Sequence, residues 1–288
     1  MISVVIVNYN SGELLGACVR SVLASNVPVE IVVSDNGSCD DSISSLKSAI
    51  ASPNLKILEN GANLGFSKAN NIALKETSGD YILFLNPDCV IRPDTLQSMR
   101  KVMESNPDAG MSGCMIRNLD GSEQAGCRRN VPTPWRSMVR VFRLSRLFGN
   151  HPKFRSFVLV GQPLPEKPAE IEAISGAFMF VRRSSMEKVG PLDEHYFLHC
   201  EDLDWCMRFR KMGYSILFVP DVEITHRKGG SSGGRPIFVE WHKHKGMIRF
   251  YRKFFRHQYP SMLMIAVFML VWARFLAKSL AALAKKPG

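Results

Sequence analysis

The sequence lacks any cysteine pattern that would indicate a disulfide framework or a structural zinc site. Its seven cysteines are scattered, with no CxxC pair among them. An odd number of unpatterned cysteines predicts reduced thiols in a cytosolic environment. We also expect no secretory leader, because the opening MISVVIVNYN has no charged-then-apolar run and soon turns polar. These residues predict a buried first strand instead.

Recognisable nucleic-acid modules are absent as well. No zinc finger, RNP aromatic pair or helix-turn-helix pattern accompanies the formal net charge of +11. Most of the excess positive charge lies after Cys127, in two separate basic clusters. We therefore expect no nucleic-acid partner, and we attribute the charge to binding of a membrane surface or of phosphate groups.

The chain also lacks the low hydrophobicity of disordered proteins. With 288 residues, 45% of them hydrophobic and 22% charged, it predicts one large folded domain, either alone or with an appendage. Short β-branched runs alternate with amphipathic stretches, which is typical of βα units and a mainly parallel sheet. We expect helices at about 14–23, 94–106 and 201–212, and strands at SVVIVNY, VEIVVSD, NLKILEN, YILFLNPD, AGMSGCMI, AISGAFMFVRR and SILFVPD.

This rhythm breaks in two places. The segment 119–170, rich in arginine, proline and glycine, has only a weak helical pattern around 137–147 and predicts a variable, partly mobile insertion. The segment 238–288 joins interleaved basic and aromatic residues to the apolar stretch MLMIAVFMLVWA, which Arg274 and Lys278 then interrupt. We favour a membrane-associating helical tail that lies on the bilayer, with a helix docked on the main domain as the alternative. Whether residues 261–284 span the bilayer stays open.

Glycine fingerprints of the GxGxxG or Walker type are missing too. Four predicted strands end instead in polar residues, and in open α/β sheets ligands bind beyond the carboxyl ends of the strands. Any one of these residues could be a plain turn former. Four such ends on one rim indicate a nucleotide site of a different kind. The residues are Asn8 and Asn10, Asp35 and Asn36, Asn60 and Asn63, and Asn86 and Asp88.

Two groups of oxygen-bearing side chains are candidates for chemistry. Asn86 and Asp88 form an i, i+2 pair of ligands suited to Mg²⁺ or Mn²⁺. Glu201, Asp202 and Asp204 open a predicted helix, where acidic residues also serve as caps. The preceding GPLDEHYFLH is dense in polar and aromatic residues, as a binding pocket would be, which favours a functional role for these carboxylates.

An ordered set of motifs makes the chain resemble the inverting family 2 glycosyltransferases, and among them the rhamnosyltransferase-like members. The motifs are VVIVNYN, VVSDNGS, NLGFSKANN, YILFLNPD, ISGAFMFVRR and EDLDWCMRFRKMGY. The resemblance covers about residues 2–255 and implies a GT-A fold, a Rossmann-like, mixed but mainly parallel α/β sheet flanked by helices. It implies a catalytic domain (1–237) made of a nucleotide-sugar-binding half (1–118), the insertion (119–170) and an acceptor half (171–237), followed by the tail (238–288).

The resemblance also implies roles for individual residues. Asp35 would contact the nucleobase, and Asp202 would be the catalytic base of the family's ED motif, beside Glu201. Asn86 and Asp88 would occupy the DXD position, which binds the metal and the diphosphate. Further donor contacts would come from Asn8, Asn10, Asn36, Asn63, Gly65, Phe66 and Asn70, and acceptor contacts from Ser175, Gly176, Glu201 and Trp205.

One position departs from the family pattern. Asn86 offers a neutral oxygen where many members have a carboxylate, which leaves open how tightly a metal binds. In similar enzymes a histidine at the place of His226 ligates the metal, so we expect His226 to compensate. Without the family context, a lone histidine beside a strand would be an ordinary surface or core residue.

These features together predict transfer of a sugar, with rhamnose as the family-level expectation, from a dTDP- or UDP-linked donor. The acceptor would be a hydroxyl of a glycan or lipid-linked glycan at the cytoplasmic face of a membrane. Mg²⁺ or Mn²⁺, with Arg227 or Lys228, would stabilise the leaving diphosphate, while RKGGSSGGRP would be either a lid or an ordinary solvated loop. Two alternatives stay open: a non-catalytic nucleotide-sugar-binding membrane scaffold, and a sugar-phosphate nucleotidyltransferase.

Overall fold

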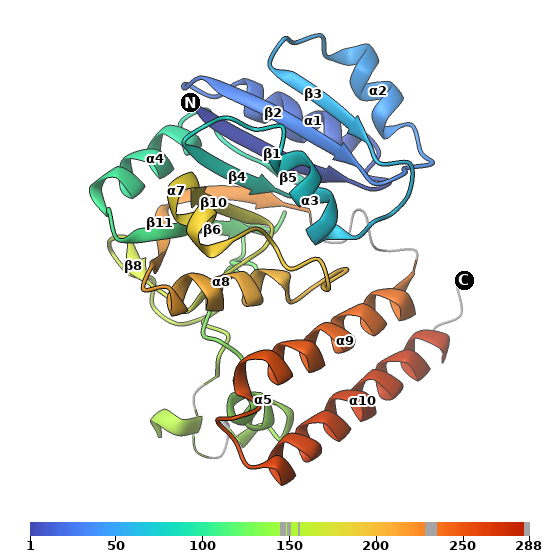
Figure 1. Cartoon of the computed structure of the whole chain (residues 1–288), viewed down its shortest axis with the longest axis vertical. Coiled ribbons are helices and arrows are strands. Elements are labelled where there is room, and N and C mark those ends of the chain that lie inside the picture. The colour runs from blue at the N-terminus through green and yellow to red at the C-terminus, as the bar shows by residue number, and fades with distance from the viewer. Residues whose placement is uncertain (145–147, 149–150, 155, 228–234, 285–288) are drawn as a thin grey trace.

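A nine-stranded sheet forms the centre of the protein (Figure 1). The structure is a computed structural model and describes residues 1–288 apart from 145–147, 149–150, 155, 228–234 and 285–288. Across the sheet the strands are β3 (Leu55–Glu59), β2 (Val29–Asp35), β1 (Ile2–Asn8), β4 (Tyr81–Leu85), β10 (Phe178–Arg182), β6 (Ala109–Arg117), β11 (Ser215–His226) and β5 (Cys89–Val90), with β8 (Ala169–Glu170) paired to β11. The first four strands in this order are mutually parallel, as are β6 and β11, while β10 is antiparallel to both of its neighbours. The predicted mixed but mainly parallel sheet is confirmed.

Both faces of the sheet are covered, so β1 is buried along its whole length and is mostly apolar. Alternate residues of β1 point to opposite faces, with Ile2, Val4 and Ile6 in one core and Val5 in the other. The first core includes residues of α1 (Glu13–Leu23), α2 (Ser42–Ala49) and α4 (Thr95–Ser105). The second includes residues of α3 (Phe66–Leu74), α7 (Arg183–Val189) and α8 (Glu201–Lys211).

The prediction of a single strand at AISGAFMFVRR is wrong. A turn separates β9 (Ala173–Ile174) from β10, because the Ser175 hydroxyl accepts a hydrogen bond from the Ala177 N–H (3.2 Å). β9 then leaves the main sheet and pairs with β7 (Arg128–Arg129) in a separate two-stranded sheet. The interruption brings the turn residue Gly176 to the candidate site described below.

The segment 119–170 contains little regular structure. Besides β7 and β8 it holds α5 (Pro134–Val141) and the 3-10 turn η1 (Pro152–Phe154). α5 begins with Pro134 at its first turn and with Thr133 as its cap, whose hydroxyl accepts from the Arg136 N–H. The helical pattern expected around 137–147 therefore starts earlier, and residues 145–147 of that expectation lie outside the described residues.

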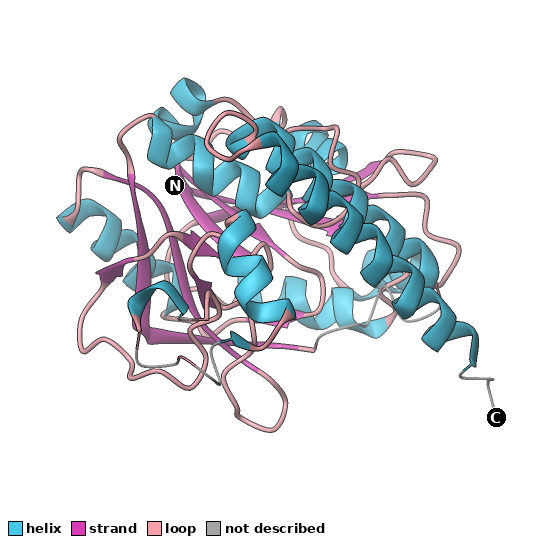
Figure 2. Ribbon diagram, turned by 90° about the horizontal axis from the view of Figure 1, so that it is seen from below, coloured by secondary structure: helices cyan, strands magenta, loops and turns pink. Residues whose placement is uncertain are grey.

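Two long helices, α9 (Pro236–Phe255) and α10 (Ser261–Ala284), form an antiparallel pair against α8 and α5 (Figure 1). α10 buries Met264, Val267 and Val271 and leaves its other side exposed. By length and composition alone α10 would suffice to cross a membrane, and 17% of its most apolar stretch is buried. Its C-terminal end lies beyond the edge of the sheet (Figure 2).

Candidate active site

The polar residues that follow β1 and β2 form one hydrogen-bonded network. The parallel register places Asn8 beside Asp35, and the Asn8 amide donates to the Asp35 carboxylate (2.8 Å) and to the hydroxyls of Ser38 (3.0 Å) and Ser42 (2.8 Å). Asp35 also accepts from the N–H (3.0 Å) and hydroxyl (2.6 Å) of Ser38. Asn10, at a positive φ of 50°, turns the chain so that its N–H donates to the same hydroxyl (3.0 Å). The structure thus brings these residues, which were predicted to bind the nucleotide sugar, together on one rim of the sheet.

A second set of predicted donor residues joins this rim to the loop before α8. The Asn36 amide donates to the Asn63 side chain and to the Gly65 carbonyl, both at 3.3 Å. Gly65 has a φ of 86°, and a Cβ there would lie 2.8 Å from both the ring and the carbonyl oxygen of Phe197. The Phe66 N–H donates to that carbonyl at 2.7 Å. Only glycine permits this close approach of the two loops.

His226 and Asp88 meet because β11 pairs with β5, which sets His226 opposite Cys89. The His226 Nε2 atom lies 3.0 Å from Asp88 Oδ1, and the amide nitrogen of Asn86 lies 3.5 Å from the same Nε2. Asp88, Cys89 and His226 form a buried group of possible metal ligands. Burial, followed by the charge of Asp88, raises the pKa of the Cys89 thiol well above its ordinary value, so Asp88 and His226 are the stronger ligands.

Gln124, which the sequence did not single out, orients the His226 ring. Its amide nitrogen donates to the Asn118 side chain (2.9 Å) and to the His226 carbonyl (3.3 Å), so its oxygen accepts from His226 Nδ1 (2.6 Å). With the ring proton on Nδ1, the lone pair of a neutral His226 at Nε2 faces the Asp88 carboxylate. Two lone pairs at this separation require a cation or a proton between them, so the residues fit a divalent metal.

The catalytic candidates Glu201 and Asp202 begin α8 immediately after a strained stretch of backbone. His199 and Cys200 have φ angles of 68° and 72°, a conformation that residues other than glycine rarely adopt. Such strain occurs where the surrounding structure enforces it, often at functional sites. Here the strained backbone comes directly before α8, whose first two residues are the carboxylates Glu201 and Asp202.

Asp202 is held in place by three groups. Its Oδ2 atom accepts from the Gly176 N–H (3.2 Å) and pairs with the Arg129 guanidinium, and its Oδ1 atom accepts from the Leu203 N–H (2.8 Å). The side chain stays 13% exposed. Although burial opposes it, the negative charge of Asp202 raises the pKa of Arg129. The sequence did not point to Arg129, because it lies in the insertion and no motif contains it.

The other two carboxylates of EDLD have different surroundings. Burial and then the charge of Asp202 raise the pKa of Glu201 to about 8, and its Oε2 atom has no hydrogen-bond partner among the described residues. Asp204 is fully buried and pairs with Arg208 (2.8 Å) and Lys253 (2.6 Å), which ties α8 to α9. Of the three carboxylates, Asp202 is the most exposed, and it is the one that Arg129 joins to the insertion.

Residues 3–190 match the family described as Glycosyl transferase family 2. The chain belongs to this family. Over 248 residues this family 2 glycosyltransferase is 31% identical to the N-acetylglucosaminyl-diphospho-decaprenol L-rhamnosyltransferase of Mycobacterium tuberculosis, covering 82% of this chain and 79% of that one. It is 27% identical over 234 residues to rhamnosyltransferase WbbL of Escherichia coli (78% and 83% covered). It is also 26% identical over 175 residues to dTDP-rhamnosyl transferase RfbF of Shigella flexneri (60% and 52% covered).

Solved glycosyltransferase structures share its fold. The mannosyltransferase PcManGT of Pyrobaculum calidifontis, in complex with GDP-Man and Mn²⁺, superposes with a TM-score of 0.61 at 18% identity, covering 100% of this chain and 76% of that one. GalNAc-T7 with UDP, GalNAc and Mn²⁺ gives 0.64 at 18% identity (88% and 47% covered). The GT-A fold and the prediction of a glycosyltransferase are confirmed, which decides against the scaffold and nucleotidyltransferase alternatives.

Two predicted contact residues of the glycosyltransferase lie in the core. Trp205 is fully buried, donates its indole N–H to the Gly190 carbonyl (2.9 Å) and packs edge-on against Phe84. Its assignment to the acceptor is therefore corrected, since no part of the ring is available to a ligand. Asn70 is buried in α3 and donates to the Phe66 carbonyl of the same helix (2.9 Å), so its amide N–H groups stabilise the helix.

The stretch RKGGSSGGRP, expected to be either a lid or an ordinary solvated loop, falls mostly on residues 228–234, including Lys228, which lie outside the described residues. Arg227 is described, and its N–H donates to the Asp88 carbonyl (3.0 Å). This contact places the start of the loop beside the predicted metal ligands.

Proposed function

We propose that this glycosyltransferase inverts the anomeric centre of a nucleotide sugar as it transfers the sugar to a hydroxyl of a lipid-linked glycan. One observation carries the proposal. The turn between β9 and β10 holds both candidate centres, since the Gly176 N–H donates to Asp202 (3.2 Å) and the next carbonyl, of Ala177, accepts from the Asn86 N–H (3.0 Å). The proposed base and the proposed diphosphate site are thus anchored by two consecutive residues.

The donor is proposed to be a dTDP- or UDP-sugar, in the first place rhamnose. The rhamnosyltransferase names of the relatives support the sugar, and the dTDP of the Shigella relative supports the nucleotide. Asn8 and Ser38 hold the Asp35 carboxylate in a fixed position at the rim, where it would accept from the nucleobase N–H. Asn36 and Asn63 would line the adjoining part of the cleft.

Asp88 and His226, with Asn86 beside them, would hold a Mg²⁺ or Mn²⁺ ion, and Gln124 would keep the His226 Nε2 lone pair directed at it. Such an ion supplies positive charge to the diphosphate as it leaves. The Mn²⁺ in the two structurally similar proteins supports this assignment, and the choice between the two metals is left to experiment. Arg227, next to Asp88 in space, would add a further positive charge.

Asp202 would take the proton of the acceptor hydroxyl while the hydroxyl oxygen attacks the anomeric carbon from the face opposite the diphosphate. The bond from that carbon to the diphosphate oxygen breaks in the same displacement, which gives inversion. Arg129 orients Asp202. Glu201, with a pKa of about 8, would stay protonated near neutral pH and leave Asp202 as the base of the pair.

The tail would bring the enzyme to its acceptor. We propose that the catalytic domain (1–237) works at the cytoplasmic face of a membrane and that the segment 238–288 lies on the bilayer. The exposed apolar side of α10 and the lipid-linked substrate in the name of the mycobacterial relative support this placement.

Isothermal titration with UDP, dTDP and GDP, each with and without Mn²⁺ or Mg²⁺, tests the donor site without knowledge of the acceptor. We expect metal-dependent binding of dTDP or UDP, weakened in Asp88→Ala and His226→Ala and unchanged in Asp221→Ala, an exposed residue of β11. Absence of binding by every nucleotide under every metal condition would contradict the proposed site.

A further inference from the structure

The two longest stretches of the sequence without an acidic residue are residues 124–165 and residues 241–288. Both contain many arginines and lysines. The first lies in the insertion, and the second forms most of the tail. A surface with charge of one sign attracts partners of the opposite sign, so both stretches are candidates for contact with a negatively charged partner.

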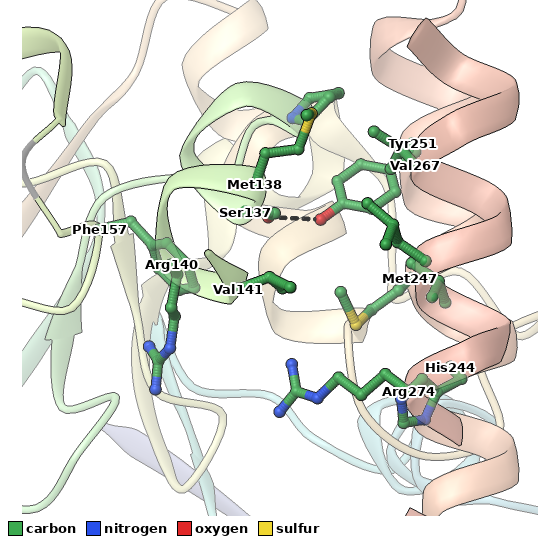
Figure 3. A pocket seen from close by; sticks show the side chains of 13 residues that line it. Ser137, Met138, Arg140, Val141, Phe157, His244, Met247, Tyr251, Val267 and Arg274 are labelled. Carbon is green, nitrogen blue, oxygen red and sulfur yellow. Dashed lines mark hydrogen bonds between the residues drawn. The ribbon is translucent and has the colours of Figure 1, made fainter. Parts of the chain in front are cut away.

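The structure packs helices of the two stretches against each other. α5 of the insertion contacts α10 of the tail, and the Ser137 hydroxyl of α5 lies 2.6 Å from the Tyr251 hydroxyl of α9, at hydrogen-bond distance. Figure 3 shows Val141 of α5 across this contact from Met247 and Arg274. The space enclosed between the helices is about 50 Å³, which has room for only a few water molecules. α5, α9 and α10 therefore form one packed unit.

The exposed side of α10 is apolar along the length of the helix. Six large apolar residues are exposed there, and at about 100° per residue they fall on one stripe about 60° wide. They are Met262, Ile265, Met269, Leu276, Leu280 and Leu283. Leu270, which lines the contact with α5, is about a quarter of a turn from the edge of this stripe. α5 therefore borders the exposed apolar stripe of α10.

The C-terminal end of α5 is itself exposed and mixes apolar with basic side chains. Arg140, Val141, Phe142 and Arg143 are four successive exposed residues, and Val141 and Phe142 are 47% and 51% exposed. Together with the stripe of α10, these side chains form an apolar patch and not isolated exposed residues. Aromatic and basic residues side by side are typical of helices at the boundary between lipid headgroups and acyl chains.

The basic residues at this border have no carboxylate partner in the described part of the chain. Arg140, Arg143 and Arg274 form no ion pair there, and Arg140 lies over the Phe157 ring at 5.0 Å. Burial lowers the pKa of Arg140, and the like charge of Arg274 lowers it further. Anionic groups at this border would oppose the repulsion between the two guanidiniums.

We propose that the insertion is a second membrane-binding element, in which the end of α5 contacts a bilayer with anionic lipids beside α10. Val141 and Phe142 would enter the headgroup region, and Arg140 and Arg143 would meet lipid phosphates. The proposal rests on the placement of the tail on the bilayer in the proposed function. A second copy of the chain would bring two positively charged, acid-free surfaces together, and a soluble polyanion would leave the apolar side chains in water.

The same insertion also reaches the candidate base. Arg129, which pairs with Asp202, precedes α5 in the chain, and the short segment from Arg129 to Pro134 spans at most about 18 Å. The insertion would therefore join the bilayer to the side of Asp202 by a short path. A lipid-linked acceptor is held at the membrane, so this link would keep the base near its substrate.

Flotation of the full-length protein with phosphatidylcholine vesicles, with and without phosphatidylglycerol, tests the proposal. We expect tighter binding to the vesicles that contain phosphatidylglycerol. Phe142→Ser should weaken binding to both kinds of vesicle about tenfold, because a large apolar side chain is lost from the interface. Phe142→Trp is the matched control and should bind at least as tightly as the wild type, since tryptophan suits the membrane interface.

Arg143→Gln tests the electrostatic part of the contact. It should weaken binding to the anionic vesicles about fivefold and leave binding to the neutral vesicles unchanged. Arg20→Gln is the matched control, because Arg20 is exposed on α1, at the opposite end of the molecule from α5 (Figure 1). Thermal melting followed by circular dichroism should be the same for all of these variants, which shows that they are folded.

Leu280→Ser, on the exposed side of α10, separates this proposal from the placement of the tail. Weaker binding by Leu280→Ser, with wild-type binding by Phe142→Ser and Arg143→Gln, would overturn the contact of the insertion and leave the tail placement intact. No vesicle binding by the wild type would overturn both, while nucleotide titration would still test the donor site. A dimer in sedimentation experiments that Phe142→Ser abolishes would assign the surface to a second copy and overturn the proposal.

Discussion

The ends of β1 and β2 and the start of α8 differ in how they hold a buried carboxylate. On the rim at the ends of β1 and β2, which we call the donor rim (Asn8, Asp35, Asn36, Ser38 and Asn63), the Asp35 carboxylate accepts from the Asn8 amide and from Ser38. At the start of α8, the Glu201 carboxyl is buried, its Oε2 atom has no hydrogen-bond partner among the residues that the structure describes, and the backbone before it is strained. The first arrangement is a rigid platform. The second retains unfavourable energy, which is typical of the place where chemistry occurs.

Asp202→Asn should affect the start of α8 and leave the donor rim unaffected, and it has the largest expected effect. We expect the transfer rate to fall by about 10²–10⁴-fold, the usual contribution of a general base, while nucleotide affinity stays the same. Release of nucleoside diphosphate with a lipid-linked acceptor measures the first quantity, and titration calorimetry the second. Asp221→Asn, at an exposed site, is the control. Transfer near the wild-type rate would move the base to another residue.

Gly65→Ala breaks the contact between the donor rim and the loop before α8. We expect a loss of about 3 kcal/mol in the free energy of unfolding, because alanine is strained at this backbone angle and its Cβ would overlap Phe197. Gly61→Ala is the matched control, since its φ of 71° is similar but open space surrounds it, and we expect a loss of about 1 kcal/mol. Urea unfolding measures both values. Equal losses in the free energy of unfolding would show that Phe197 moves aside at little energetic cost.

Gln124→Leu tests whether the predicted metal ligands beside the donor rim depend on the orientation of His226. Because Gln124 orients His226, we expect Mn²⁺ affinity in the presence of nucleotide to fall about 10–100-fold. Electron paramagnetic resonance of free Mn²⁺ measures this affinity. Gln162→Leu, at an exposed position in the same insertion, should leave it unchanged. An unaltered affinity in Gln124→Leu would show that His226 Nε2 is not a ligand.

Glu201→Gln tests the buried charge at the start of α8 directly. The folded state raises the pKa of Glu201 from its ordinary 4.5 to about 8, so between these values the folded protein holds a proton that the unfolded chain has lost. The free energy of unfolding that Glu201 contributes therefore falls as pH rises through this window and levels off above it. Urea unfolding at several pH values should show this slope in the wild type and its loss in Glu201→Gln.

The control for Glu201→Gln is Glu13→Gln, because Glu13 also begins a helix but is exposed. The slope should persist in that variant. The same slope in both variants would assign it to groups other than Glu201.

The parallel half of the sheet was predictable from local pattern alone. The runs SVVIVNY and VEIVVSD became β1 and β2 almost residue for residue, because strands buried on both faces are mostly apolar. The polar residues at their ends were predictable for the same reason, since parallel strands present their carboxyl ends at one edge. The acceptor half was less predictable. The Ser175 turn broke a run that local pattern indicates as one strand.

The sequence by itself determined the fold class, the family and the carboxylates that are candidates for chemistry, because strand periodicity and ordered motifs are local properties of a chain. Only the tertiary structure decided which side chains surround those carboxylates. Arg129 reaches Asp202 across 73 positions of sequence, and Gln124 reaches His226 across 102. Trp205 lies next to the same motif and yet belongs to the core. Burial and pairing depend on contacts between distant segments, and no spacing within a segment encodes them.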